Sequence, residues 1–270
     1  MKKNKYLLFA ISLIMCLLLT GCGVSKEKQA ATDAFKAEVS RIEAQLTERD
    51  SAVKSAEAII TAGKLGIDLT LKPTLEAAIS SAKAITVEIP KIPSDVEKIN
   101  TATEGLKAID NSTSIKAVID AQANLEKSIK QYEQMTAPKE AFIVERLKNV
   151  ANVVEVSAVT EDNDPNGNLN KAGGYTASIY FSNKLVNQSE VDGNSVIDKG
   201  TDCGGNIEVY ATADEANKRN TYLSNFDGTI FASGSHSVIG TVVIRTSNLL
   251  KASEQKAFEA SIVEALTKLS

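Results

Sequence analysis

The segment best suited to chemistry is a short run of acidic and amide side chains in the second half of the chain. Side chains that offer oxygen atoms stand at every second position: Asp162, Asp164, Asn166 and Asn168, with Gly167 among them. Calcium prefers oxygen ligands, and a glycine turn lets alternating side chains converge on one ion. The spacing therefore predicts these four residues as metal ligands and calcium as the candidate cofactor.

The same run departs from the EF-hand loop, whose first half it resembles. Its twelfth position is Gly173, where an EF-hand carries a bidentate Glu, and Pro165 is unusual inside such a loop. Asn, Asp, Pro and Gly are also the residues that favour turns between strands. Two interpretations stay open, weak calcium binding or a solvated turn without metal. No other cofactor is indicated.

The one histidine of the chain lies in a serine-rich segment, in which Ser233, Gly234 and Ser235 precede His236. Adjacent residues of a strand point to opposite faces, so Ser235 and His236 are not expected to pair. The sequence also contains no Gly-x-Ser-x-Gly motif of a serine hydrolase. We expect a turn or a ligand contact here, and we assign no catalytic residue.

Three further side chains are candidates for ligand binding. Arg219 and Tyr222 lie on one predicted helix, and Arg245 lies on a predicted strand. Guanidinium groups bind carboxylates and phosphates through paired hydrogen bonds. The alternative is that both arginines pair with acidic residues of their own domain.

An alternative function is a carboxylate-dependent cell-wall hydrolase. Such an enzyme needs two carboxylates that converge in a cleft. Asp198, Asp202 and Glu208 are the candidates for that pair. Cys203 has no histidine near it in sequence to activate its thiol, so we expect it to be structural.

Composition limits the classes of function. A length of 270 residues suits one or two domains. Lys and Arg number 30 against 34 Asp and Glu, a net charge of −4, so a basic nucleic-acid surface is not expected. A single histidine excludes zinc sites that are rich in histidine.

The N-terminus has the pattern of an export signal. Basic residues at 2, 3 and 5 precede an apolar run at 6–19, which is shorter than the roughly 20 residues of a membrane-spanning helix. The run ends in Leu19-Thr20-Gly21-Cys22. This ending resembles the lipobox of bacterial lipoproteins, which implies cleavage after residue 21 and lipidation of Cys22. The alternative is an uncleaved anchor with Cys22 as a small buried residue.

Residue patterns predict an α+β protein in two parts. Apolar residues spaced three and four apart predict helices at 26–62, after Pro73, from a cap at Ser94, and at about 112–132. Residues 22–137 would form an antiparallel helical bundle or stalk. Residues 138–270 would form an α+β head with a mostly antiparallel sheet, in the order α-β-β-β-α-β-β-α.

Parts of the predicted head are similar to uncharacterised Gram-positive lipoproteins, some of them EbhA-like. The similar segments are 162–183, with Asp-Pro-Asn-Gly, and 214–247, with Phe-Asp-Gly and Ser-Gly-Ser-His. The resemblance implies a recurring module on the outer face of the cell membrane and no known reaction. We therefore expect a lipid-anchored extracytoplasmic lipoprotein with a binding or structural role. Its partners would be the membrane and a cell-wall or surface protein, not nucleic acid. A weak calcium-dependent adhesin is the remaining alternative.

Overall fold

The computed structural model describes residues 25–229, 232 and 234–269. The predicted signal segment 1–21, Cys22 and Ser233 lie outside these residues. Within the described ranges, none of the helices combines the length and the apolar character needed to cross a bilayer.

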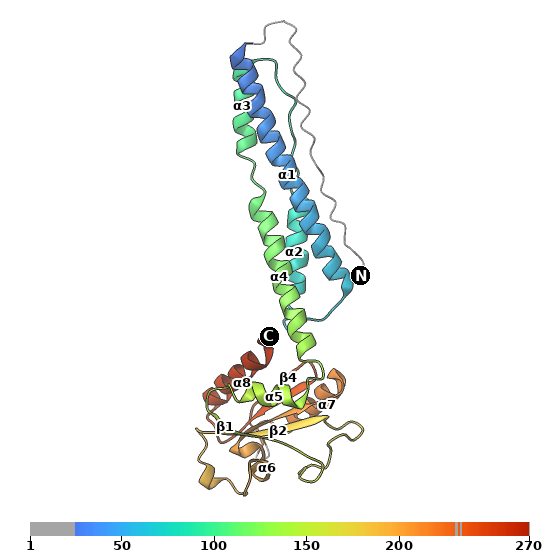
Figure 1. The fold of residues 1–270 in the computed structure, drawn as a ribbon, viewed down its shortest axis with the longest axis vertical. Helices are drawn as coiled ribbons and strands as arrows, with labels where there is room; N and C mark the ends of the chain where they lie inside the picture. The colour runs from blue at the N-terminus through green and yellow to red at the C-terminus, as the bar shows by residue number, and fades with distance from the viewer. Residues whose placement is uncertain (1–24, 230–231, 233, 270) are drawn as a thin grey trace, which may run out of the picture. The chain divides into compact units, whose positions relative to one another are not determined.

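The fold is α+β, as predicted, with helices first and one five-stranded antiparallel sheet after them (Figure 1). The first helices are α1 (Lys26–Ala62), α2 (Leu71–Ala84), α3 (Val96–Lys107) and α4 (Ser112–Gln134). The later elements are α5 (Glu140–Leu147), β1 (Val153–Ala158), β2 (Ala177–Asn183), α6 (Val196–Lys199), β3 (Gly204–Val209), α7 (Ala213–Ser224), β4 (His236–Ile239), β5 (Val242–Thr246) and α8 (Ala252–Thr267).

The chain forms two compact units. One comprises the chain up to Leu46 together with Val87–Asp110, and the other comprises Thr47–Thr86 and the chain from Asn111 onward. The predicted boundary after residue 137 lies between α4 and α5, inside the second unit. We call the part of this unit from α5 onward the sheet domain. The helices that precede this point in the second unit belong to the same compact body as the sheet.

The first unit is held by an apolar stripe of α1 against α3. Phe35 and Ile42 of α1 pack with Ile99 and Leu106 of α3, and all four are buried. The Nη2 of Arg41 donates to the carbonyl oxygens of Leu106 (2.9 Å) and Ile109 (3.0 Å), so a basic side chain of α1 binds the C-terminal end of α3. The cap of α3 is Asp95 and not Ser94, because the Asp95 carboxylate accepts from two amides of the first turn.

The helical part of the second unit has its own core. Val53 and Ala56 of α1 pack with Leu75 and Ile79 of α2 and with Leu125 of α4. These residues fall on the three- and four-residue spacing that predicted the helices, so each helix buries one stripe of its surface.

The sheet has the strand order β1-β2-β3-β5-β4, with every neighbouring pair antiparallel. One face is apolar, and α5 and α8 cover it (Figure 1). Phe181 and Ile207 from the strands pack there with Ile143 of α5 and with Phe258 and Ile262 of α8. Gly204 and Gly205 begin β3, and neighbouring atoms leave no room for a Cβ at either position.

The opposite face of the sheet is polar, yet it is also buried. Alternation along β3 places Asn206 and Glu208 on this face, and both side chains are fully buried. The antiparallel register sets Ser178 of β2 opposite Glu208, and Arg245 of β5 opposite Asn206. Helix α7 covers part of this face, where a second apolar cluster includes Tyr210, Ala216, Leu223 and Val243.

The end of α4 is joined to the hairpin between β4 and β5. The amide of Thr241 donates to the carbonyl oxygen of Met135 (3.0 Å), and the amide of Ala137 donates to Thr241 Oγ1 (2.7 Å). Gly240 has φ +59°, and a Cβ there would clash with the Met135 carbonyl. The hairpin turn therefore needs glycine for its conformation and for this close approach.

Candidate functional site

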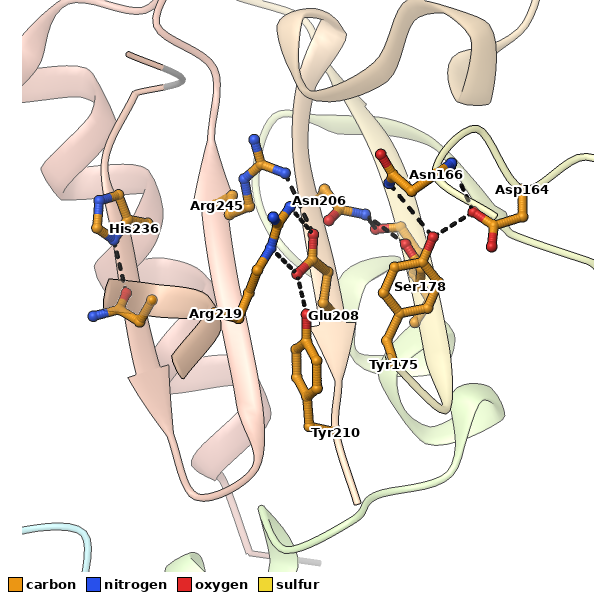
Figure 2. A network of polar contacts seen from close by, with 12 residues as sticks. Asp164, Asn166, Tyr175, Ser178, Asn206, Glu208, Tyr210, Arg219, His236 and Arg245 are labelled. Carbon is orange, nitrogen blue, oxygen red and sulfur yellow. Dashed lines mark hydrogen bonds and ion pairs between the residues drawn. The ribbon is translucent and has the colours of Figure 1, made fainter. Parts of the chain in front are cut away.

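A buried ion cluster lies at the centre of the polar face (Figure 2). Arg219 of α7 binds Glu208 in a bidentate way, with Nε to Oε2 at 2.8 Å and Nη2 to Oε1 at 2.9 Å. Arg245 Nη1 lies 3.3 Å from Oε1. The hydroxyl of Tyr210 donates to Oε2 at 2.8 Å. We call Glu208, Tyr210, Arg219 and Arg245 the Glu208 cluster.

Burial makes these interactions mutually dependent. A carboxylate without access to water costs several kcal/mol unless partners replace its hydration, and here two guanidinium groups and a hydroxyl do so. Burial alone would lower the pKa of Arg219, but hydrogen bonding and attraction to Glu208 hold this pKa above its usual value. Burial, with the nearby Glu208 carboxylate, raises the pKa of Tyr210 far above its usual value. The phenol therefore stays protonated and donates a hydrogen bond to Glu208.

The structure brings the three predicted ligand-binding residues together. Both arginines contact Glu208, and the guanidinium carbon of Arg219 lies 5.4 Å from the ring centroid of Tyr222. Pairing with an acid of the same domain, the alternative considered from the sequence, is the arrangement found. The residue at the centre of this arrangement is Glu208, which the sequence singled out only as a candidate for hydrolysis.

The three candidate carboxylates of a hydrolase lie in different environments. Asp198 is exposed and accepts from the amide of Ser195 (3.1 Å) in a capping box, and Asp202 is also exposed. Glu208 is fully buried, and its described partners are two arginines and a tyrosine. This environment holds the carboxylate of Glu208 in fixed ion pairs.

The loop before β2 is organised by Asp164 (Figure 2). Its carboxylate accepts from the amides of Asn166 (3.0 Å), Asn168 (2.6 Å) and Leu169 (2.7 Å), and from the hydroxyl of Tyr175. Partial burial alone would raise the pKa of Asp164, but these hydrogen bonds hold it below the usual 3.8. The loop is thus a turn closed around one carboxylate.

The predicted calcium ligands do not form a ligand cage in the structure. The Asp164 oxygens face N–H and O–H donors, and Asp162 is exposed. Asn166 and Asn168 contribute their backbone amides to the turn, and Asn166 Nδ2 lies 3.4 Å from the Tyr175 hydroxyl oxygen. Over the described part of the chain, no group of three or more His, Cys, Asp or Glu is placed to hold a metal. In this geometry the loop is a hydrogen-bonded turn, and calcium binding by the four residues stays a prediction.

Replacing Asp164 with Asn should lower the free energy of unfolding by about 2 kcal/mol at neutral pH, since amide N–H groups cannot accept from the backbone. The difference between the two proteins should shrink as the pH falls below 3.8 and through the lowered pKa of Asp164. The wild-type carboxyl group is then protonated and, like the amide of the variant, uncharged. Urea unfolding over this pH range measures the effect. Asp162→Asn is the matched control, with an expected change within about 0.5 kcal/mol. Equal effects of the two substitutions would contradict the assigned role.

His236 is engaged by residues other than the neighbouring serines. Its Nδ1 lies 2.7 Å from Asn220 Oδ1, and its Nε2 lies 3.2 Å from Asp227 Oδ1. Ser235 Oγ lies instead 2.8 Å from Thr246 Oγ1. The histidine therefore ties β4 to α7 and to the turn that follows α7.

Cys203 is fully buried and immediately precedes β3, the middle strand of the sheet. Its Sγ lies 3.2 Å from the Gly200 carbonyl oxygen and 3.5 Å from that of Phe181. Burial raises the pKa of the thiol to about 11, so the reactive thiolate is disfavoured.

Beside the Glu208 cluster lies an open cavity of about 370 Å³. The loop before β2, the residue after β3 and one side of α7 form its walls. Its lining consists of Asn166, Asn168, Gly173, Gly174, Tyr175, Tyr210, Glu215, Lys218 and Arg219.

No protein-family model matches this sequence, and neither a curated protein nor a solved structure matches it. The functional argument therefore rests on the residues of this chain.

Proposed function

We propose that this chain is a lipoprotein of the extracytoplasmic face of a bacterial cell membrane, anchored through Cys22, and that its sheet domain has a binding role there. The observation that carries the proposal is the Leu19-Thr20-Gly21-Cys22 ending of a short apolar run with basic residues before it. Two or more acyl chains on one cysteine supply stable attachment, since each buried CH₂ contributes about 0.8 kcal/mol.

The charge of the chain is consistent with attachment by lipid. Loss of the first 21 residues removes three lysines, so the remaining chain is more acidic than the −4 of the full sequence. Anionic lipid headgroups repel an acidic protein at distances within about a Debye length. The acyl chains would then hold the protein at a surface that does not attract the rest of it.

The geometry of the sheet domain supports a binding role. The titratable groups beside the cavity are engaged with each other, with Glu208 bound to Arg219 and Asp164 bound to Tyr175. Such interactions hold a polar wall in one arrangement before a ligand arrives, and preorganisation lowers the cost of binding.

Cells that express the full chain can be labelled with a palmitate analogue and fractionated. We expect Cys22→Ala to abolish labelling and to release the protein from the membrane fraction. Cys16→Ala is the matched control, because Cys16 lies inside the segment that cleavage would remove, and its labelling should equal that of the wild type. Unchanged labelling and membrane retention in Cys22→Ala would overturn the proposal.

A further inference from the structure

We infer that the cavity beside the Glu208 cluster binds a neutral, hydroxyl-rich ligand, a saccharide. The inference rests on the proposed binding role and names the chemical class of the ligand. Its volume of about 370 Å³ lies in the range of small-molecule pockets, so it can hold one or two sugar rings.

The charges around the cavity favour a neutral ligand over an anion. Three charged residues line it, and each has a partner. Arg219 binds Glu208, Lys218 Nζ lies 2.8 Å from Asp214, and Glu215 Oε2 accepts from the amide of Thr212 at 3.1 Å. Arg245 adds a second cation on Glu208 and so offsets Glu215. Asp164, bound to Tyr175, adds one further acid beside the cavity. An anion would therefore have to compete with carboxylates that already hold both cations.

The wall also presents hydrogen-bond acceptors and donors side by side. The hydroxyls of Tyr175 and Tyr210 donate hydrogen bonds to Asp164 and Glu208. Burial is the largest cause that raises the pKa of each tyrosine well above 10, so both stay protonated. Both residues line the cavity although they are almost fully buried, and toward a ligand their oxygens can only accept. Arg219 binds Glu208 through Nε and Nη2, so its Nη1 is the nitrogen left to donate. A sugar hydroxyl both donates and accepts, so it matches such a wall.

An exposed aromatic ring adjoins the cavity through Arg219. Tyr222 is 54% exposed, and the ring of Phe226 lies edge-on to it at a centroid distance of 5.1 Å. The Arg219 guanidinium lies over the same ring and also lines the cavity. The part of this ring that Arg219 leaves exposed can pack on the apolar C–H face of a sugar ring that extends from the cavity.

The test uses the full chain in detergent, with N,N′-diacetylchitobiose as the neutral probe and with inorganic phosphate and acetate as anionic probes. Calorimetry or ligand-detected NMR measures binding. We expect the disaccharide to bind and the anions not to bind. Asn168→Ala and Tyr222→Ala should each weaken disaccharide binding roughly tenfold.

Both substitutions are chosen to leave the fold intact. Asn168 is exposed and uses its backbone amide in the turn, and Tyr222 is also exposed. Tyr222→Phe is the matched control and should bind like the wild type, because it keeps the ring. No disaccharide binding, disaccharide binding that neither alanine substitution weakens, or binding of the anions in its place would overturn the inference. The Cys22 labelling result is independent of these outcomes, so failure here is distinguishable from failure of the proposed function.

Discussion

Replacing Glu208 with Ala should lower the free energy of unfolding by about 3–5 kcal/mol. The substitution removes the carboxylate that both Arg219 and Arg245 contact, and it leaves the Tyr210 hydroxyl without its acceptor. Most of this cost comes from Arg245, because its side chain is only 11% exposed and water cannot replace the lost carboxylate. Urea unfolding followed by far-UV circular dichroism measures the change.

Glu161→Ala is the control for Glu208→Ala, because Glu161 is an exposed acid of the same domain. A double variant, Glu208→Ala with Arg245→Ala, tests the physical cause. It should lose less stability than the two single variants added together, because no unpaired buried cation remains on β5. The role of the ion pairs in stabilising the buried face would be contradicted by either of two results. One is a double variant whose loss of unfolding free energy equals the sum of the single losses, and the other is a Glu208→Ala variant as stable as the control.

Replacing Gly205 with Ala should destabilise the second unit by about 3 kcal/mol or more. Gly205 lies inside β3, where an added Cβ would clash with the carbonyl oxygen of Arg245 and with the ring of Phe181. The carbonyl belongs to the neighbouring strand, and the ring is fully buried, so neither can move without disturbing the sheet. Thermal unfolding should show a melting temperature lower by roughly 6–12 °C.

Gly105→Ala is the matched substitution for comparison. Gly105 lies on the exposed side of α3, and nothing lies within 4 Å of an added Cβ. Alanine there should stabilise the helix by about 0.5–1 kcal/mol, because glycine is a poor helix former. If Gly205→Ala proved as harmless as Gly105→Ala, the close packing assigned to the start of β3 would be wrong.

The helices and most strands could be predicted because their signals are local. The apolar spacing that predicts α1 forms a packed stripe in the structure, and Thr212 and Glu215, three positions apart, form a capping box at the start of α7. Such patterns depend on residues a few positions apart, which one sequence displays. Strand order is different, since β5 lies between β3 and β4, and only contacts between distant segments determine that arrangement.

The Glu208 cluster could not be predicted from the strand pattern. Asn206 and Glu208 alternate with Ile207 and Val209, which in an antiparallel strand usually indicates one buried face and one face in water. Here α7 and the loop before β2 cover much of the polar face, so the charge of Glu208 is paired with arginines of the same domain and not with water. Tyr210, at the next position on the same face, is the one sequence signal for a covered surface.

The loop at 162–168 illustrates a different limit. The same oxygen atoms can hold a cation or accept from backbone amides, and residue types alone do not decide between these uses. In the structure the Asp164 carboxylate accepts from backbone amides and, across eleven positions, from the Tyr175 hydroxyl. The sequence located the segment, and its interaction partners depend on the fold.

The joint at the end of α4 has a mechanical consequence. Met135 and Ala137 are hydrogen-bonded to Thr241 in the hairpin, and the Gln134 side chain donates to the Leu266 carbonyl oxygen (2.6 Å) at the end of α8. A pull applied along α4 is therefore borne by the hairpin and by α8 as well as by the peptide bonds that lead into α5. The force would therefore reach the sheet domain at two separate places, and the segment between α4 and α5 would not rotate freely.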